Sequence, residues 1–393
     1  MPTAIGPSSA GGDLPADFAS RVVAWQRLHG RHGLPWQGTR DPYRIWLSEI
    51  MLQQTQVSTV LRYYAPFLAR FPTVSDLARA ALEEVLALWS GLGYYSRARN
   101  LHACARAVCE LHGGSFPTDR AVLESLPGIG PSTAAAVAAF SVGQRVSILD
   151  GNVKRVLARH RAFGQDLARP AGLRALWAMA DALLPTQGEI EAYTQGMMDL
   201  GATVCVQRRP RCGVCPVAAD CMARVQCSLQ DYPVKSARLG RGRRTSVLLM
   251  ALQPHGAVLM QRRPPRGVWG GLWALPEFID EPHLWRALAA GGLPRELQVE
   301  ALPTVRHALT HLDWVLQPRR LLVSESAMAG PLIAAVAQAL GLTSKSADPS
   351  VGNPVLSWMD LGIALDCGLP APIRVLLKEQ AQRLQDPERG VGP

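Results

Sequence analysis

Residues 126–134 read LPGIGPSTA, with two glycines and two prolines directly before the alanine-rich segment STAAAVAAF at 132–140. Glycine and proline disfavour helix interiors, so this stretch predicts a turn between two helices. Gly128 and Gly130 leave backbone N–H groups uncovered at the start of the second helix, and such an end attracts anions, phosphate above all. The pattern also fits an ordinary turn between packed helices, so its meaning depends on the rest of the chain.

Length and composition indicate a folded, basic protein of two or three domains. The chain has 393 residues, of which 48% are hydrophobic and 18% charged. Its 41 Lys+Arg against 31 Asp+Glu give a net charge of +10, which suits a nucleic acid better than a membrane. Residues 1–16 lack the charged and apolar regions of a signal peptide, and no run reaches transmembrane length. We therefore expect a disordered lead-in at 1–16 and a cytoplasmic protein.

The chain changes character near residue 226. Residues 17–225 show helical periodicity and almost no alternation of period two. The pattern predicts one helix over 41–71, which starts at an Asp41 N-cap and Pro42, and another over 74–89. Residues 226–245 are polar, basic and interrupted by Pro and Gly, as in a linker. Residues 246–384 predict an α+β domain, with a β-hairpin around the Pro-His-Gly turn at 254–256, strands within 304–325 and a closing helix at 370–384. Residues 385–393 predict a disordered tail.

Four cysteines form the pattern C-x6-C-x2-C-x5-C, at Cys205, Cys212, Cys215 and Cys221. Four thiolates this close together fit one tetrahedral zinc ion or an iron–sulfur cluster. Disulfides are the alternative, which a cytosolic chain disfavours. The long first loop also carries Arg208, Arg209 and Arg211, whose guanidinium groups are placed to meet phosphates.

Two carboxyl groups occupy unusual positions. Glu49 lies on or beside the apolar face of its helix, near Ile45 and Trp46, so its pKa should rise. Asp150 lies where a short apolar segment meets a new helix, whose N-terminus favours the ionised form. A pair with diverging pKa values supplies the acid and the anion that glycosidic cleavage requires. The alternative is that Glu49 is a buried structural residue and Asp150 only an N-cap.

Several motifs resemble one family of DNA repair proteins. The stretch LPGIGPSTA with LDGNVKRV (149–156) resembles the helix–hairpin–helix and Gly/Pro…Asp module of base-excision DNA glycosylases. Four further motifs narrow the resemblance to the A/G-specific adenine DNA glycosylase (MutY) family. They are WLSEIMLQQTQV (46–57), GLGYYSRARNLH (91–102), MMDLGATVC (197–205) and the cysteine loop. RGVWGGLWALPEF (266–278) and GLPAPIRVLL (368–377) extend it more loosely. The resemblance implies an all-α helix–hairpin–helix DNA glycosylase domain with an iron–sulfur loop, followed by a smaller α+β Nudix-like domain.

The resemblance also implies roles for matching residues. Glu49 is expected to protonate adenine N7, Asp150 to stabilise the oxocarbenium-like sugar, and Asn152 to help order that site. The cysteine loop is expected to hold a 4Fe–4S cluster. Four further positions are implied to contact the flipped adenine or the duplex around it: Trp36 and Gln195 line the adenine pocket, and Gln54 and Tyr94 enter the duplex. The backbone-binding hairpin comprises Gly128, Gly130, Ser132 and Lys154.

Three departures from related patterns refine the expected chemistry. Glycosylases that also cut the strand carry a Schiff-base lysine at the hairpin position of Ser132, so this chain should remove the base and stop. The second domain lacks the acidic Nudix helix, and where the family has a Phe-Ser-His loop for 8-oxoguanine it has Leu309, Thr310 and His311. Threonine can replace serine as a hydroxyl donor, but leucine cannot stack as phenylalanine does.

The resulting hypothesis is a monomeric, monofunctional glycosylase that acts on double-stranded DNA, at adenine opposite 8-oxoguanine or guanine, without a membrane partner. An endonuclease III-like glycosylase-lyase for oxidised pyrimidines is the first alternative, and Ser132 and the Nudix-like domain argue against it. A non-catalytic DNA-binding protein is disfavoured by the presence of both Glu49 and Asp150 in their motifs. A Nudix hydrolase is disfavoured by the missing acidic helix.

Overall fold

A computed structural model describes residues 18–186, 188–234, 236, 240–292, 298–323, 326–342 and 355–385. The predicted lead-in at 1–16, the tail from 386 and four residues of the predicted linker lie outside these ranges. The chain divides into two compact units. One combines residues 1–54 with 107–237, and the other combines 55–106 with 238–393.

The first unit is helical, as predicted. Its elements are α1 (Phe18–His29), α2 (Pro42–Leu52), α7 (Arg120–Glu124), α8 (Pro131–Val142), α9 (Gly151–His160), α10 (Pro170–Ala182), α11 (Ile190–Asp199), the π-helix η1 (Leu200–Val204), the 3-10 helix η2 (Cys212–Val214) and α12 (Met222–Val225). Helix α2 begins as expected, because the Asp41 carboxylate accepts the backbone N–H of Tyr43 at 2.9 Å and proline occupies the first turn.

Two predicted helices are each interrupted. The segment 41–71 is α2 followed by α3 (Val57–Arg70), and 74–89 is α4 (Val74–Arg79) followed by α5 (Leu82–Leu88). The first break contains Gln54, whose φ of +56° lies in the left-handed region. At the second break Ala80 and Ala81 are extended. Apolar spacing continues across both breaks, so periodicity does not reveal them.

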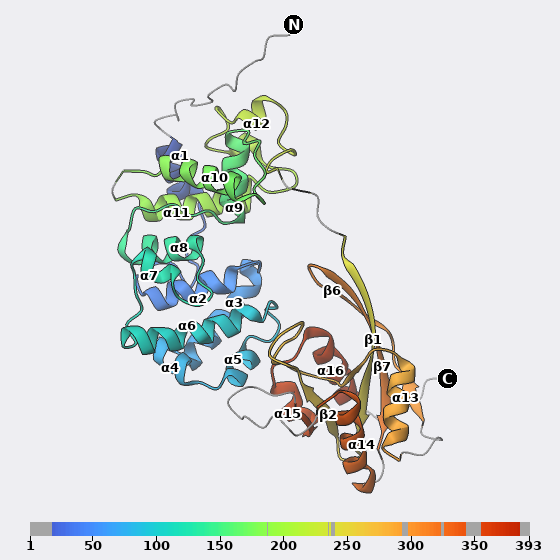
Figure 1. Ribbon diagram of the computed structural model, residues 1–393. Coiled ribbons are helices and arrows are strands. Elements are labelled where there is room, and N and C mark those ends of the chain that lie inside the picture. The colour runs from blue at the N-terminus through green and yellow to red at the C-terminus, as the bar shows by residue number, and fades with distance from the viewer. Residues whose placement is uncertain are drawn as a thin grey trace. The chain divides into compact units, whose positions relative to one another are not determined.

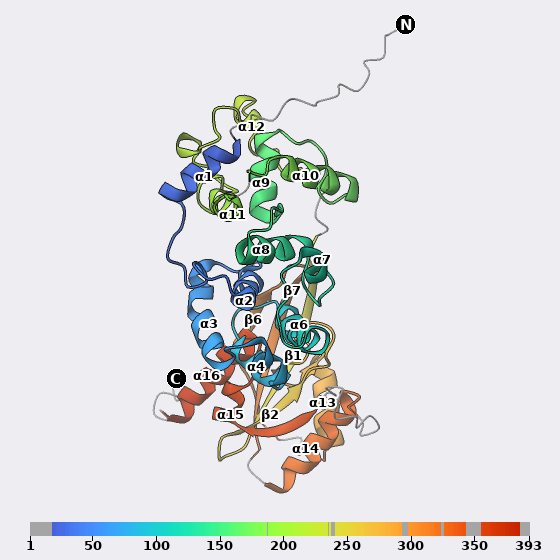
Figure 2. The same ribbon diagram turned by 90° about the vertical axis from the view of Figure 1, so that its left-hand side faces the viewer.

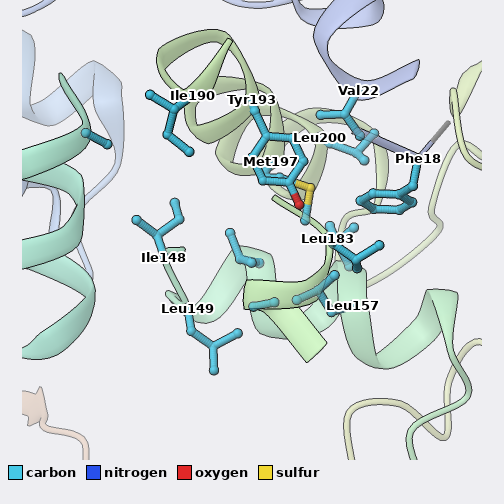
Figure 3. Packing of buried hydrophobic residues seen from close by; sticks show 14 of the residues in the cluster. Phe18, Val22, Ile148, Leu149, Leu157, Leu183, Ile190, Tyr193, Met197 and Leu200 are labelled. Atoms are coloured by element: carbon cyan, nitrogen blue, oxygen red, sulfur yellow. The ribbon is translucent and has the colours of Figure 1, made fainter. Parts of the chain in front are cut away.

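The hairpin at 126–134 has the predicted form. Helix α7 is followed by a turn in which Gly128 has φ +76°, a conformation that favours glycine, and α8 begins at Pro131. Most of α8 is buried, in agreement with its alanine-rich composition. A buried core joins α1, α9 and α11, and it includes Ile148 and Leu149; Figure 3 shows Met197 and Tyr193 of α11 within it.

The second unit combines helices with a mixed sheet, which Figure 1 shows. Besides α3 to α5 it contains most of α6 (Ser96–His112) and the strands and helices β1 (Gly242–Leu252), β2 (Ala257–Arg262), β3 (Trp273–Ala274), β4 (Glu277–Phe278), α13 (Glu281–Ala290), β5 (Val299–Ala301), β6 (Val305–Ala308), β7 (Leu312–Leu322), α14 (Ser326–Ala339), β8 (Leu356–Asp360), α15 (Leu361–Asp366) and α16 (Ala371–Gln385). The sheet order is β3-β2-β1-β7-β5, and β1 pairs with β7 in parallel.

The sheet confirms the predicted hairpin and the strands within 304–325. β1 and β2 pair antiparallel, as do β6 and β7, and α16 is the closing helix. β1 begins at Gly242, inside the stretch predicted as linker, because its polar first residues already pair with β7. α13 and α14 cover one face through a shared apolar cluster (Figure 2). In the part of the chain that the structure describes, no helix is long and apolar enough to cross a membrane.

Candidate active site

The start of α8 is open and well anchored. Gly130 is its N-cap and provides no side chain to accept the first N–H groups of the helix, which leaves that end available for an anion. The Ser132 hydroxyl accepts the backbone N–H of Leu149 at 3.1 Å. The Gln53 side-chain amide donates to Thr133 Oγ1 at 3.3 Å. These two bonds connect the hairpin to the segment before Asp150 and to the end of α2.

Asp150 caps α9 and is closely surrounded by donors. Its Oδ1 accepts the backbone N–H groups of Asn152 at 3.0 Å and Val153 at 2.8 Å, and its Oδ2 accepts the Asn152 side-chain amide at 3.3 Å. Ile148 and Leu149, the two residues before it, are buried in the core (Figure 3). The apolar anchor on one side and the cap on the other fix the position of the carboxylate.

Glu49 lies on α2 among buried neighbours, and its carboxyl is electrostatically coupled to Asp150. Burial first, and repulsion by Asp150 second, raise the pKa of Glu49 to about 7, which confirms the predicted direction. Burial also raises the pKa of Asp150, although its hydrogen bonds and Arg155 oppose the rise. The expectation that the helix N-terminus keeps the pKa of Asp150 low is therefore wrong, because burial of the carboxyl outweighs the cap.

Arg155 connects the carboxylate site to the cysteine loop. One Nη donates to Asn152 Oδ1 at 2.9 Å and to the Gly201 carbonyl at 2.7 Å, and its Nε donates to the Cys205 carbonyl at 2.8 Å. Asn152 in turn donates to Asp150. A continuous set of hydrogen bonds therefore runs from the cysteine loop to the catalytic candidate Asp150.

The thiols of the four cysteines are close enough to interact electrostatically. The pKa of Cys215 is raised to about 12, by burial first and then by the charges that the thiols of Cys205, Cys221 and Cys212 would carry. The buried Arg159 places its guanidinium 3.6 Å from Cys205 Sγ and donates to the Val206 and Gln207 carbonyls at 2.7 and 3.0 Å. Such thiols bind metal as thiolates, whose charge a metal centre and a buried arginine offset. Among the described residues, no group of three or more His, Cys, Asp or Glu side chains is arranged to hold a single metal ion.

The first loop of the cysteine segment is arginine-rich and exposed, as predicted. Arg208 and Arg209 are exposed, and Arg209 has φ +52°. Arg211 folds back instead, so that its Nε donates to the Thr203 carbonyl at 3.1 Å. Two of the three arginines thus remain candidates for phosphate contact.

The residues expected around the adenine lie in the first unit. Trp36 is buried, and Gln195 on α11 is partly buried. The Gln195 side-chain amide donates to Asp199 Oδ1 at 2.8 Å, and this fully buried carboxylate also pairs with Arg31 at 2.6 Å. Because a carboxylate only accepts, the NH2 group of Gln195 must face Asp199, and its Oε1 is the atom left to accept from a ligand.

The two residues expected to enter the duplex share an unusual backbone. Gln54 and Tyr94 are both exposed, and their φ values are +56° and +48°. Non-glycine residues in this region carry strain and cluster at functional sites. Tyr94 lies above the buried Arg97, whose guanidinium carbon is 5.6 Å from the centre of the tyrosine ring.

The β6–β7 turn carries the expected lesion-reading residues. Thr310 and His311 are exposed, and Leu309 closes the turn by donating its backbone N–H to the Leu312 carbonyl at 2.8 Å. The Thr310 hydroxyl lies 3.3 Å from the Tyr94 hydroxyl, within the second unit. The structure therefore brings a residue expected to enter the duplex together with the residue expected to read the base opposite adenine.

The remaining expected residue, Lys154, is partly buried on α9, and its backbone N–H bonds to the Asp150 carbonyl. Sequence reasoning missed Arg155, Arg97 and Asp199, which bond Asn152, the carbonyls just before Tyr94, and Gln195 respectively. The one signal for them is their place within the motifs at 149–156, 91–102 and 197–205.

Comparisons with known proteins agree with this arrangement. Residues 47–177 match the HhH-GPD superfamily of base excision DNA repair proteins, and residues 247–379 match the NUDIX domain. The chain is 32% identical to adenine DNA glycosylase of Buchnera aphidicola (subsp. Baizongia pistaciae), over 78% of this chain and 87% of that protein. It is 36% identical to adenine DNA glycosylase of Homo sapiens, over 76% of this chain and 64% of that protein. The solved structure of a thermostable thymine-DNA glycosylase is 29% identical over 53% of this chain and 96% of that one, with a TM-score of 0.49. By its sequence and its two matched domains, this chain belongs to the adenine DNA glycosylase family.

Proposed function

We propose that this protein hydrolyses the N-glycosidic bond of adenine mispaired with 8-oxoguanine or guanine in double-stranded DNA. The observation that carries the proposal is the pair Glu49 and Asp150, two coupled carboxyls in one unit with the open hairpin end of α8. We further propose that the protein acts in the cytoplasm of a bacterial-type cell, associated with the nucleoid through DNA binding, and that its working form is a monomer.

The surroundings of the two carboxyls support a different role for each. Asp150 accepts three hydrogen bonds, which favour its anion, whereas both influences on Glu49 raise its pKa. A proton that the pair shares therefore resides on Glu49. Glu49 donates this proton to N7 of the flipped adenine, and the Asp150 anion stabilises the positive charge that develops on the sugar as the bond breaks.

The hairpin supports cleavage of the base without cleavage of the strand. At the position where a Schiff-base lysine would attack the sugar, this chain has Ser132, whose hydroxyl is already bonded to the Leu149 backbone. A hydroxyl cannot form an imine. Gly128, Gly130 and Lys154 are proposed to hold the phosphate near the lesion, because the base must leave the stack before it can be reached.

We propose that Cys205, Cys212, Cys215 and Cys221 hold a 4Fe–4S cluster. Their mutual proximity and the guanidinium of Arg159 beside Cys205 Sγ fit a thiolate-bound metal centre of high negative ligand charge. When bound, the cluster fixes the loop that carries the Cys205 carbonyl, which Arg155 bonds. Purified protein should be yellow-brown with about four irons per chain; colourless, active protein containing one zinc would refute the cluster.

The test of the proposed function compares three duplexes, with adenine opposite 8-oxoguanine, adenine opposite guanine, and thymine glycol. Products are read before and after alkali, since a monofunctional enzyme leaves an abasic site that only alkali cleaves. We expect alkali-dependent cleavage at adenine alone, and no protein–DNA adduct after borohydride. Strand cleavage without alkali, or adduct formation through Lys154, would instead favour a glycosylase-lyase.

A further inference from the structure

The turn between α5 and α6, residues 89–95, carries Tyr94 on a strained backbone; we call it the Tyr94 turn. Gly91, Gly93 and Tyr94 have φ values of +104°, +73° and +48°. The φ of Gly91 would strain any other residue, and a Cβ there would lie 2.2 Å from Tyr63 Oη, so the tyrosine would also have to move. A backbone of this kind persists only where the surrounding structure determines it.

The helices of the second unit support the turn from one side. The Trp89 indole donates to the Gly93 carbonyl at 3.2 Å, and Arg97 Nη2 donates to the carbonyls of Leu92 and Gly93, each at 3.2 Å. The same guanidinium lies 5.2 Å from the centre of the Trp89 ring. These bonds fix the carbonyl groups at the centre of the turn.

The C-terminal part of the chain supports the turn from the other side. The buried Leu369 has a carbonyl that accepts the Tyr95 hydroxyl at 2.7 Å and the Ser90 hydroxyl at 3.0 Å. Arg374 on α16 donates through Nη2 to Ser90 Oγ and to the Cys367 carbonyl, both at 2.9 Å. Gly368 permits the close approach, since a Cβ there would lie 3.0 Å from Leu86 Cβ.

We propose that Leu369 and Arg374, with Ser90 and Tyr95 as their partners, form a C-terminal clamp that positions Tyr94 against the duplex. This inference rests on the proposed function and deepens it. The C-terminal domain then acts on the mispair twice, through Thr310 at the opposite base and through the clamp on the neighbouring Tyr94. Arg374, Ser90 and Tyr95 are positioning residues that determine how well 8-oxoguanine is distinguished from guanine, without touching DNA themselves.

The test compares Arg374→Met with Arg99→Met. Arg99 also joins α6 to the C-terminal domain, but its guanidinium bonds the Gly270 carbonyl, at 2.7 Å, rather than the Tyr94 turn. Both changes remove one positive charge, so any general loss of DNA affinity is matched. The measured quantity is the ratio of single-turnover excision rates for adenine opposite 8-oxoguanine and opposite guanine. We expect this ratio to fall about fivefold in Arg374→Met, the effect of losing its one side-chain hydrogen bond to the Tyr94 turn, and to stay unchanged in Arg99→Met.

Two further measurements separate positioning from a general structural effect. In the Tyr94→Ala background, Arg374→Met should cause no additional fall in the ratio, because the clamp acts only through Tyr94. A 2-aminopurine placed beside the 8-oxoguanine should brighten on binding of the wild type, and less in Arg374→Met and in the conservative Tyr95→Phe. Full additivity with Tyr94→Ala, or equal losses in Arg99→Met, would overturn the clamp.

Failure of the clamp is distinguishable from failure of the proposed function. If the wild type excises adenine with no preference for 8-oxoguanine, the proposed specificity is wrong. The clamp is then tested by the 2-aminopurine signal. It is also tested by comparing the effect of Arg374→Met on excision from the guanine duplex in the wild-type and Tyr94→Ala backgrounds. If the wild type prefers 8-oxoguanine and Arg374→Met keeps both the ratio and the fluorescence signal, the clamp is wrong and the proposed function stands.

Discussion

At the scale of single residues, the proposed active site depends on two carboxyls that differ in their hydrogen-bond partners. Both are buried enough to raise their pKa values, but Asp150 is surrounded by hydrogen-bond donors. Glu49→Gln keeps the shape and removes the acidic proton, and Asp150→Asn removes the anion that faces the sugar. Each interaction strengthens in the transition state, so we expect single-turnover rates to fall by about 100-fold or more. DNA affinity, measured separately by titration, should change far less; near-normal excision by the Glu49 variant would contradict its role as the acid.

The raised pKa of Glu49 also predicts a cost in stability. The ordinary pKa of 4.5 applies to the unfolded chain and about 7 to the folded protein, so the folded state binds the proton more tightly. The stabilisation that this proton gives the folded state is complete below pH 4.5. It is lost as the pH rises through about 7, and the free energy of unfolding then falls by roughly 3 kcal/mol in total. Glu49→Gln carries no such penalty.

We therefore expect Glu49→Gln to be more stable than the wild type at pH 8, by roughly 3 kcal/mol, with the difference narrowing toward pH 5. Urea unfolding at the two pH values measures it. Glu124→Gln, on the exposed side of α7, is the matched control and should show no comparable gain. A difference between Glu49→Gln and the wild type that does not vary with pH would mean that the carboxyl is not held in a desolvated position.

At the scale of elements, the cysteine loop and α9 act together through Arg155. Its guanidinium bonds the Cys205 and Gly201 carbonyls on one side and Asn152 on the other. Arg155→Met keeps the bulk of the side chain and leaves those carbonyls without this donor. We expect an excision rate lower by about tenfold, since Asn152 then orients Asp150 poorly. Iron content and visible absorbance per chain report on the loop, and Arg145→Met, which releases the Pro185 carbonyl elsewhere in the same unit, is the control.

How far the sequence predicts these elements depends on where the signal is local. The hairpin, the cap at Asp150 and the β1–β2 and β6–β7 pairs follow from turn residues and periodicity, and all are present. The breaks within 41–71 and 74–89 were not predicted, because the apolar period runs through them and Gln54 gives no sign of a positive φ. Arg155, Arg97 and Asp199 also contact segments distant in sequence, at Cys205, Thr55 and Arg31 respectively, and spacing does not reveal such contacts. The net pKa of Asp150 was missed for the same reason, since burial is a tertiary property.

At the scale of the whole molecule, the chain order and the compact units do not coincide. Residues 55–106 belong with the C-terminal domain, and the bonds from Leu369 and Arg374 to the Tyr94 turn are part of that unit. A fragment ending at residue 240 keeps Glu49, Asp150, the hairpin and the cysteines, but it loses Thr310 and every partner of α5 and α6 that lies beyond residue 240. Truncation therefore removes both the reading of the opposite base and the support of Tyr94.

We expect this fragment to retain its visible absorbance and to excise adenine, but to lose most of its preference for 8-oxoguanine over guanine, because discrimination is a difference between two binding energies. It should also unfold at a lower temperature than the full chain, since Leu86 and the Tyr94 turn lose the covering of Gly368 and Leu369. Thr310→Ala in the full chain should lower the preference by only about fivefold, the value of one hydrogen bond. Single-turnover excision from the two duplexes at one fixed salt concentration measures both effects, since phosphate contacts make affinity salt-dependent. A fragment that keeps the full-length ratio would place lesion recognition in the helices before residue 240, and the Nudix-like domain would then need another role.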